Sequence, residues 1–188
     1  TRVRSSAASD VYKRQIMPVY PFQERMPTIA DDVFIAPGAM IIGDVTIHAG
    51  ASIWYNAVVR GDTAPIVIGR RTNIQDNCTL HVDADAPLTI GDDCTVGHGA
   101  VVHGATVGDR VLVGMQAVVL SHARVGEGTI IGACTLVSEH KEIPQGVLAV
   151  GIPARVARPL KPEEAAHIIS SAQGYHERAR LHQRSINS

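Results

Sequence analysis

The sequence predicts a mainly β fold, a parallel β-helix followed by one C-terminal α-helix. Three observations support this prediction. An aliphatic residue returns every six positions over most of the span from Ile35 to Val137, a small or β-branched residue stands four positions after it, and an apolar stripe at helical spacing follows Pro162. A period of six fits neither an α-helix nor a simple alternating strand, but it fits a coil made of three short strands joined by tight corners.

Three repeats in each coil sort the aliphatic side chains into three columns that run along the β-helix axis. The first column contains Ile35, Ile53, Ile74, Val96, Val113 and Ile131. The second contains Ile41, Val59, Leu80, Val102, Val119 and Val137. The third contains Ile47, Ile68, Ile90, Val107 and Val125. Two interruptions, at about residues 61–67 and 82–89, follow the second column, where we expect long loops that carry function. The repeat is expected to end after Val137.

A helix is expected to begin at Pro162, because proline suits the first helical turn, and Glu163 and Glu164 favour the positive end of the helix dipole. Its apolar stripe should pack against the β-helix and comprises Ala165, Ile168, Ile169, Ala172, Tyr175 and Ala179. Gly174 argues against an unbroken helix, since it costs roughly 1 kcal/mol.

The chain divides into three parts. Residues 1–16 are polar, basic and aperiodic, and we expect them to be non-native or disordered, with the native chain starting at Met17. Residues 17–160 should form a β-helix metal-binding domain, and residues 161–188 a C-terminal helix of that same domain. A length of 188 residues suits one domain with a substantial core.

The composition limits which binding partners and which cellular compartment we expect. A formal net charge of −1 predicts neither nucleic acid nor an anionic membrane as partner, and no apolar run reaches the ~18 residues of a membrane span. Cys78, Cys94 and Cys134 show no CxxC spacing, so we expect buried or free thiols in a reducing cytoplasm rather than a disulfide framework.

Three of the nine histidines occupy informative positions. His81 follows Leu80 and His103 follows Val102, so the two imidazoles should stack one coil apart, about 4.8 Å, and could share a metal ion. His98 follows Val96 in the first column and projects from another face, so it could complete the site only from a neighbouring chain. A threefold axis would then create a homotrimer with three sites, each with an open fourth ligand position, as in catalytic zinc sites.

The alternative is that surface histidines coincide by chance. The remaining six are expected to be solvated surface histidines; they are His48, His122, His140, His167, His176 and His182.

Polar residues surround the predicted site. Arg60 occupies the slot of His81 one coil earlier, and Gln75 follows Ile74 in the first column. The side of one chain that carries Arg60 and Asp62 should therefore face the side of its neighbour that carries Gln75 and Asp76, with an Arg60–Asp76 ion pair across the joint. These residues either hold the trimer together, act in the site, or do both.

The motifs RGD at 60–62, NIQDN at 73–77, His81 and GHGAVVHG at 97–104 together resemble the γ-class carbonic anhydrase family. The six-residue repeat resembles the left-handed β-helix of the hexapeptide-repeat superfamily. The resemblance implies a homotrimer with one metal ion at each interface, held by His81 and His103 of one subunit and His98 of the next.

Further roles follow from the same resemblance. It implies that Gln75 orients a metal-bound hydroxide and that Arg60, Asp62 and Asp76 organise the interface. Tyr175 resembles a tyrosine that reaches the site in bacterial relatives, although a core position in the apolar stripe explains it equally well.

The implied reaction is reversible hydration of CO2 to bicarbonate by hydroxide on Zn2+, although Fe2+ or Co2+ would suit the same ligands. The acidic loop that relays protons in strongly active relatives is missing here, and Thr63 stands where an acid might. Three alternatives remain open: a metal-dependent acyl-CoA thioesterase, a CoA-dependent hexapeptide acyltransferase, and a non-catalytic scaffold.

Overall fold

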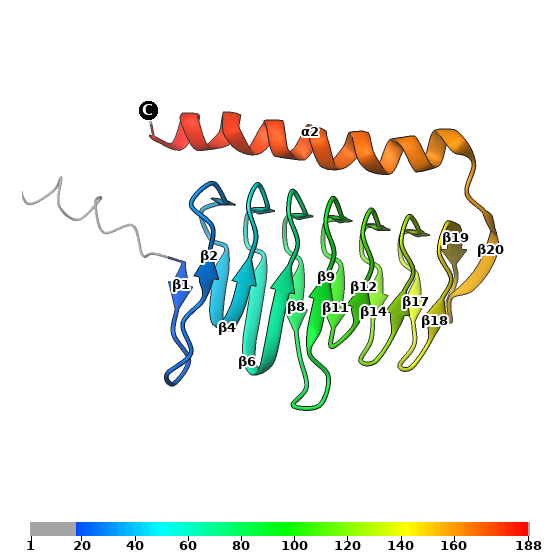
Figure 1. Ribbon diagram of the computed structural model, residues 1–188, viewed down its shortest axis with the longest axis horizontal. Helices are drawn as coiled ribbons and strands as arrows, with labels where there is room; N and C mark the ends of the chain where they lie inside the picture. Colours follow the sequence, from blue (N-terminus) through cyan, green and yellow to red (C-terminus); the bar gives the residue numbers. More distant parts are fainter. Residues whose placement is uncertain (1–17, 188) are drawn as a thin grey trace, which may run out of the picture.

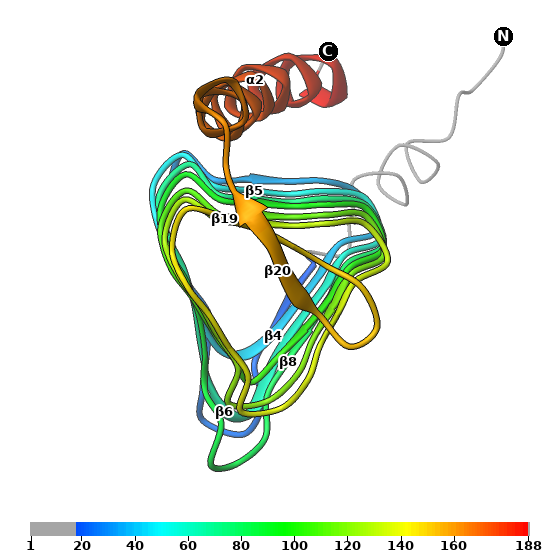
Figure 2. The ribbon, with the colours of Figure 1, turned by 90° about the vertical axis from the view of Figure 1, so that its right-hand side faces the viewer.

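The computed structural model describes residues 18–187, so the prediction for residues 1–16 lies outside the described residues. The chain forms a left-handed β-helix of triangular cross-section with helix α2 alongside it (Figure 1 and Figure 2). This confirms the predicted fold class.

The strands are short because each side of the triangle is only a few residues long. They are β1 (Val19–Tyr20), β2 (Thr28–Ile29), β3 (Phe34–Ile35), β4 (Met40–Ile47), β5 (Ser52–Ile53), β6 (Val58–Ile68), β7 (Asn73–Ile74), β8 (Thr79–His81), β9 (Leu88–Ile90), β10 (Thr95–Val96), β11 (Val101–His103), β12 (Thr106–Val107), β13 (Leu112–Val113), β14 (Val118–Val119), β15 (Arg124–Val125), β16 (Ile130–Ile131), β17 (Leu136–Val137), β18 (Glu142–Ile143), β19 (Val147–Val150) and β20 (Arg155–Pro159).

The strand register confirms the three predicted columns. Pairing is parallel from coil to coil, and registered pairs include Ile35–Ile53, Ile53–Ile74, Val59–Leu80, Val102–Val119 and Ile68–Ile90. Almost all of these aliphatic side chains are fully buried and form one core along the axis. Because side chains alternate across a strand, the residue directly after each second-column aliphatic points outward.

Two sequence expectations about the repeat are wrong. The repeat does not end after Val137, since β18 places Ile143 on Val125 and β19 places Ala149 on Ile131. The first interruption is not a loop, because β6 runs continuously through it and pairs with β4 across an irregularity at Gly43. Of the two interruptions, only the second forms a loop that projects from the β-helix. This loop lies between β8 and β9, and Asp83 and Ala86 form an isolated bridge in it.

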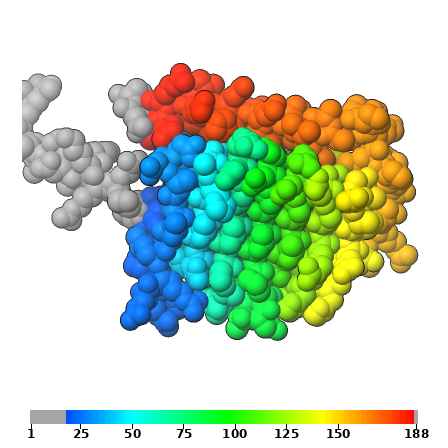
Figure 3. All heavy atoms as spheres, viewed as in Figure 1, coloured from blue at the N-terminus to red at the C-terminus, as the bar shows by residue number. Residues whose placement is uncertain are grey.

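Helix α2 (Pro162–Asn187) returns along one side of the β-helix, from its C-terminal end towards its N-terminal end (Figure 1 and Figure 3). Gly174 does not interrupt it. Ile168, Ala172 and Ala179 are buried as expected, and Tyr175 is half-buried. Ala165 and Ile169 are exposed. The helix contacts mainly β3, β5, β7 and β10. None of the described helices has the length and apolar character needed to cross a membrane.

An aromatic cluster anchors the C-terminal half of α2. His182 packs against Phe34 and Trp54, and its Nδ1 lies 2.9 Å from the hydroxyl of Tyr55. His176 Nδ1 lies 3.0 Å from the carbonyl oxygen of Gly50. These two histidines therefore fasten the helix, and the expectation that they are solvated surface residues is wrong.

Candidate metal centre

His81 and His103 face one another on adjacent coils, as their column positions predict. They are registered partners at the ends of β8 and β11. Their ring centroids lie 4.9 Å apart at 65°, and His81 Nδ1 lies 2.9 Å from His103 Nε2. Two imidazole nitrogens from separate strands therefore converge on one point at the surface of the β-helix.

The second nitrogen of His103 is held by a hydrogen-bond chain. Ser121 donates its hydroxyl proton to Asp83 Oδ2 at 2.7 Å, so its oxygen accepts the Nδ1–H of His103 at 2.9 Å. Asp83 Oδ2 itself lies 3.5 Å from that nitrogen. This chain places the proton of His103 on Nδ1 and leaves the Nε2 lone pair directed at His81.

Asp62 holds His81 in the same way. Its Oδ1 accepts a hydrogen bond from His81 Nε2 at 2.9 Å, and its Oδ2 pairs with Arg60. Burial opposes ionisation of Asp62, but hydrogen bonds from His81 and Arg60 outweigh it and hold the pKa of this carboxyl below its usual value. An ionised Asp62 fixes the ring so that Nδ1 faces His103.

His98 lies on a different face and has its own partners. Asp76 Oδ2 lies 2.8 Å from His98 Nδ1, and the hydroxyl of Tyr175 lies 3.4 Å from Nε2. The buried Gln75 accepts the backbone N–H of His98 at 3.2 Å and donates to Asn73 at 3.1 Å. Burial raises the pKa of Tyr175, so its hydroxyl remains a proton donor towards His98.

The donor set of these three histidines fits a metal ion. Each ring has one nitrogen held by an oxygen of Asp62, Ser121 or Asp76, the arrangement that orients metal-binding histidines. A tetrahedral ion with bonds of about 2.0–2.1 Å separates two ligand nitrogens by about 3.4 Å, so His81 and His103 need open by only about half an ångström. Within residues 18–187 of one chain, no three metal-binding side chains converge, and His98 does not join the pair.

A cavity of about 400 Å3 adjoins His98 beneath α2. Its lining is mixed: Gln75, His98 and Tyr175 are among its polar residues, and Leu112 and Met115 are among its apolar ones. The main strand contacts of α2 are with β3, β5, β7 and β10, and the cavity lies between α2 and residues of β10, β13 and β16.

Comparison with known proteins places the chain in a family. It is 53% identical over 147 residues to a probable carbonic anhydrase of Methanocaldococcus jannaschii, which covers 78% of this chain and 92% of that protein. It is 42% identical over 175 residues to the mitochondrial gamma carbonic anhydrase 2 of Arabidopsis thaliana, which covers 90% of this chain and 62% of that longer protein. The chain belongs to the γ-class carbonic anhydrase family.

The repeat and the fold have wider similarities. Residues 26–61 and 104–139 match the bacterial transferase hexapeptide model of six repeats. A Bacillus cereus crystal structure described as a putative acetyltransferase superposes with a TM-score of 0.87 at 42% identity, covering 88% of this chain and 96% of that one.

The structure brings most of the predicted γ-class site residues into two groups. Arg60 and Asp62 lie with His81 and His103, whereas Gln75, Asp76 and Tyr175 lie with His98. The sequence analysis missed Ser121 and assigned Asp83 no role in holding His103. Ser121 directly follows Leu120, the residue one coil beyond His103 in register, and that position was a usable signal.

Proposed function

We propose that this protein is a metal-dependent carbonic anhydrase that catalyses reversible hydration of CO2 to bicarbonate at the interfaces of a homotrimer. Three sites form, each with His81 and His103 from one subunit and His98 from the next. The observation that carries the proposal is the convergence of His81 Nδ1 and His103 Nε2 at 2.9 Å, with an oxygen holding the opposite nitrogen of each ring.

The resident ion is proposed to be Zn2+, although Fe2+ or Co2+ suits the same ligands. When bound, such an ion makes water a nucleophile near neutral pH. Neutral imidazole ligands leave its full charge available for this task. Asp62 and Ser121 hold two of the rings in position, and Gln75 and Tyr175 line the side of the site next to His98, where they can orient CO2 and bicarbonate.

Proton export is the step for which this chain is least equipped. Thr63 donates its hydroxyl to the carbonyl oxygen of Val82 at 3.0 Å and offers no titratable group. Asp83 and Asp85, with side-chain exposures of 54% and 82%, are the acids of the projecting loop. We therefore propose that hydration is limited by proton transfer to buffer, so its rate should rise with buffer concentration.

A second candidate function, hydrolysis of an acyl thioester, is favoured by the cavity beside His98. Its apolar lining residues would accept an acyl chain, and His98, which also lines it, would face the carbonyl group. Hydrolysis there would add water to the thioester carbonyl, break the carbon–sulfur bond and release a carboxylic acid and a thiol. The acyltransferase alternative is weaker, because it requires no convergence of three histidines.

Metal analysis, CO2 hydration in a stopped-flow instrument and a panel of acyl thioesters test these functions together. We expect about one metal ion per chain, and hydration that is lost in His98→Ala. His167→Ala, which changes an exposed histidine of α2, is the matched control and should keep both properties. Less than about 0.3 metal ion per chain in carefully prepared protein would refute both metal-dependent functions. Metal-loaded protein that hydrolyses thioesters but does not hydrate CO2 would select the second.

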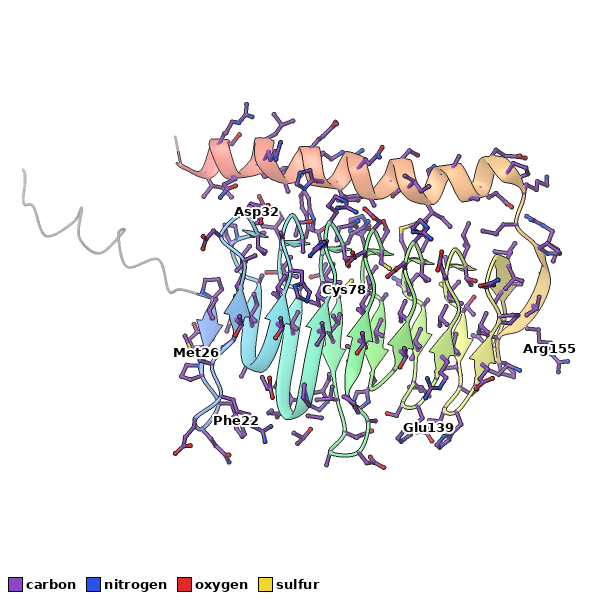
Figure 4. The ribbon with its side chains drawn as sticks, in the orientation of Figure 1. Phe22, Met26, Asp32, Cys78, Glu139 and Arg155 are labelled. Atoms are coloured by element: carbon purple, nitrogen blue, oxygen red, sulfur yellow. The ribbon has the colours of Figure 1, made fainter. Side chains whose placement is uncertain are left out.

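We also propose a reducing, cytoplasmic location. All three cysteines are free, and Cys78 lies inside the coils (Figure 4). Burial raises the pKa of Cys78 and of Cys94 to about 12, so neither thiol ionises near neutral pH. Cys134 is exposed, and a reducing compartment would protect it from oxidation.

A further inference from the structure

Two outward-facing rows of residues run along the β-helix, one on each side of the proposed interface. The first contains Tyr55, Asp76, His98, Met115 and Ala133, each two positions after a first-column aliphatic. Backbone hydrogen bonds support this row, because the carbonyls of Tyr55, Asp76, His98 and Met115 each accept an N–H from the residue that follows the next member. The second contains Arg60, His81, His103, Leu120 and Ser138, each directly after a second-column aliphatic.

Residues of the two rows alternate in height along the β-helix axis. A β-helix rises steadily by one coil, about 4.8 Å, in each circuit, so residues lie along the axis in sequence order. His98 lies between His81 and His103 in the sequence and therefore also in height. A threefold axis parallel to the β-helix keeps this height unchanged. It can therefore bring His98 of one subunit next to both His81 and His103 of the neighbouring subunit.

The same interleaving predicts the neighbours of Met115. Its position lies between His103 and Leu120 in height, so it faces those two residues of the adjacent subunit. Its side chain is 56% exposed in the single chain, although it is large and apolar, and Leu120 is only half-buried. Two coils before Met115, Asp76 falls between Arg60 and His81, where charges of opposite sign meet. Along the axis, an acid therefore faces a base one coil before His98, and an apolar residue faces an apolar residue one coil after it.

We propose that Met115 is the apolar anchor of the subunit interface, packing against the neighbouring subunit's Leu120 and closing the shared site on the side of His103. This inference rests on the proposed trimeric site and adds a specific contact to it. A flexible thioether suits the place, since it adapts to an imidazole edge and an aliphatic side chain together. Packing there excludes water from one side of the histidine cluster.

Light scattering of the full chain after size exclusion tests the inference, with bound metal measured on the same samples. We expect the wild type to have three times the chain mass, and Met115→Asp to weaken each interface by roughly thirtyfold, releasing monomers at micromolar concentration. Leu120→Asp should do the same from the other side, whereas Met115→Leu should remain trimeric. Leu181→Asp is the control, because Leu181 is a large apolar residue that is 58% exposed on α2 and belongs to neither row.

The outcomes separate this inference from the proposed function. Far-ultraviolet circular dichroism should show the same fold in all variants, since none of these side chains belongs to the buried core. If the Met115→Asp variant stays trimeric and binds metal, the proposed role of Met115 at the interface is wrong, and the proposed shared metal site still stands. A monomeric wild type would overturn both.

Discussion

Removing the hydroxyl of Ser121 should weaken metal binding without touching a metal ligand. In Ser121→Ala the Nδ1–H of His103 loses its partner at 2.9 Å. Asp83 Oδ2 already lies 3.5 Å from that nitrogen and can move in to replace it. Groups that orient a ligand typically contribute 10–100-fold to metal affinity, and the substitute partner places Ser121→Ala near the lower end, about tenfold or 1.4 kcal/mol. Ser121→Ala combined with Asp83→Asn removes the charged acceptor as well and should approach a hundredfold.

Competition for Zn2+ with a chelating dye of known affinity measures this loss directly and needs no catalytic assay. Asp85→Asn is the matched control, because Asp85 belongs to the same loop but its carboxylate lies 3.7 Å from His122, which is not a proposed ligand. Wild-type affinity in the Ser121→Ala and Asp83→Asn double variant would refute the assignment of His103 as a ligand oriented through Nδ1.

Three further predictions test the fold and its charges. Glu164 forms a bidentate ion pair with Arg158. Hydrogen bonds from Arg158 lower the pKa of the Glu164 carboxyl from 4.5 to about 2. The resulting stabilisation of the fold is complete above pH 4.5 and is lost as the pH falls to about 2. The difference in melting temperature between wild type and Glu164→Gln should therefore be constant from pH 7 to about pH 5 and vanish near pH 2, and a difference unchanged at pH 2 would contradict the pairing. In native protein only the thiol of Cys134 should react rapidly with an aromatic disulfide reagent, rising to three thiols per chain in denaturant; three fast thiols at once would show that the coils open readily. Ile74→Ala, at a fully buried position in the first column, should lower the free energy of unfolding by about 2–5 kcal/mol in a urea titration, and a loss below 1 kcal/mol would indicate that the column is loosely packed.

The coil register was predictable because it is a local property repeated along the chain. Each six-residue unit sets its own strand and corner, and stacking leaves few alternatives once aliphatic side chains must point inward. The pairing of His81 with His103 followed directly from that register. Sequence reasoning failed where the period weakened: Ile143 and Ala149 continue the columns through segments with fewer repeat signals, and β6 extends through a segment that reads as a loop.

By itself, the sequence determined the three columns and the outward slots of His81 and His103. That a second chain completes a three-histidine site stays a prediction. The position of α2 was decided only by tertiary structure, through contacts such as Tyr175 with His98, His182 with Tyr55 and His176 with Gly50. Those partners are 77, 127 and 126 residues apart, and the helical spacing of the stripe does not specify where along the β-helix it packs. The hydrogen bond from Ser121 to Asp83 likewise depends on how one projecting loop folds over the following coils, a geometry that no repeat encodes.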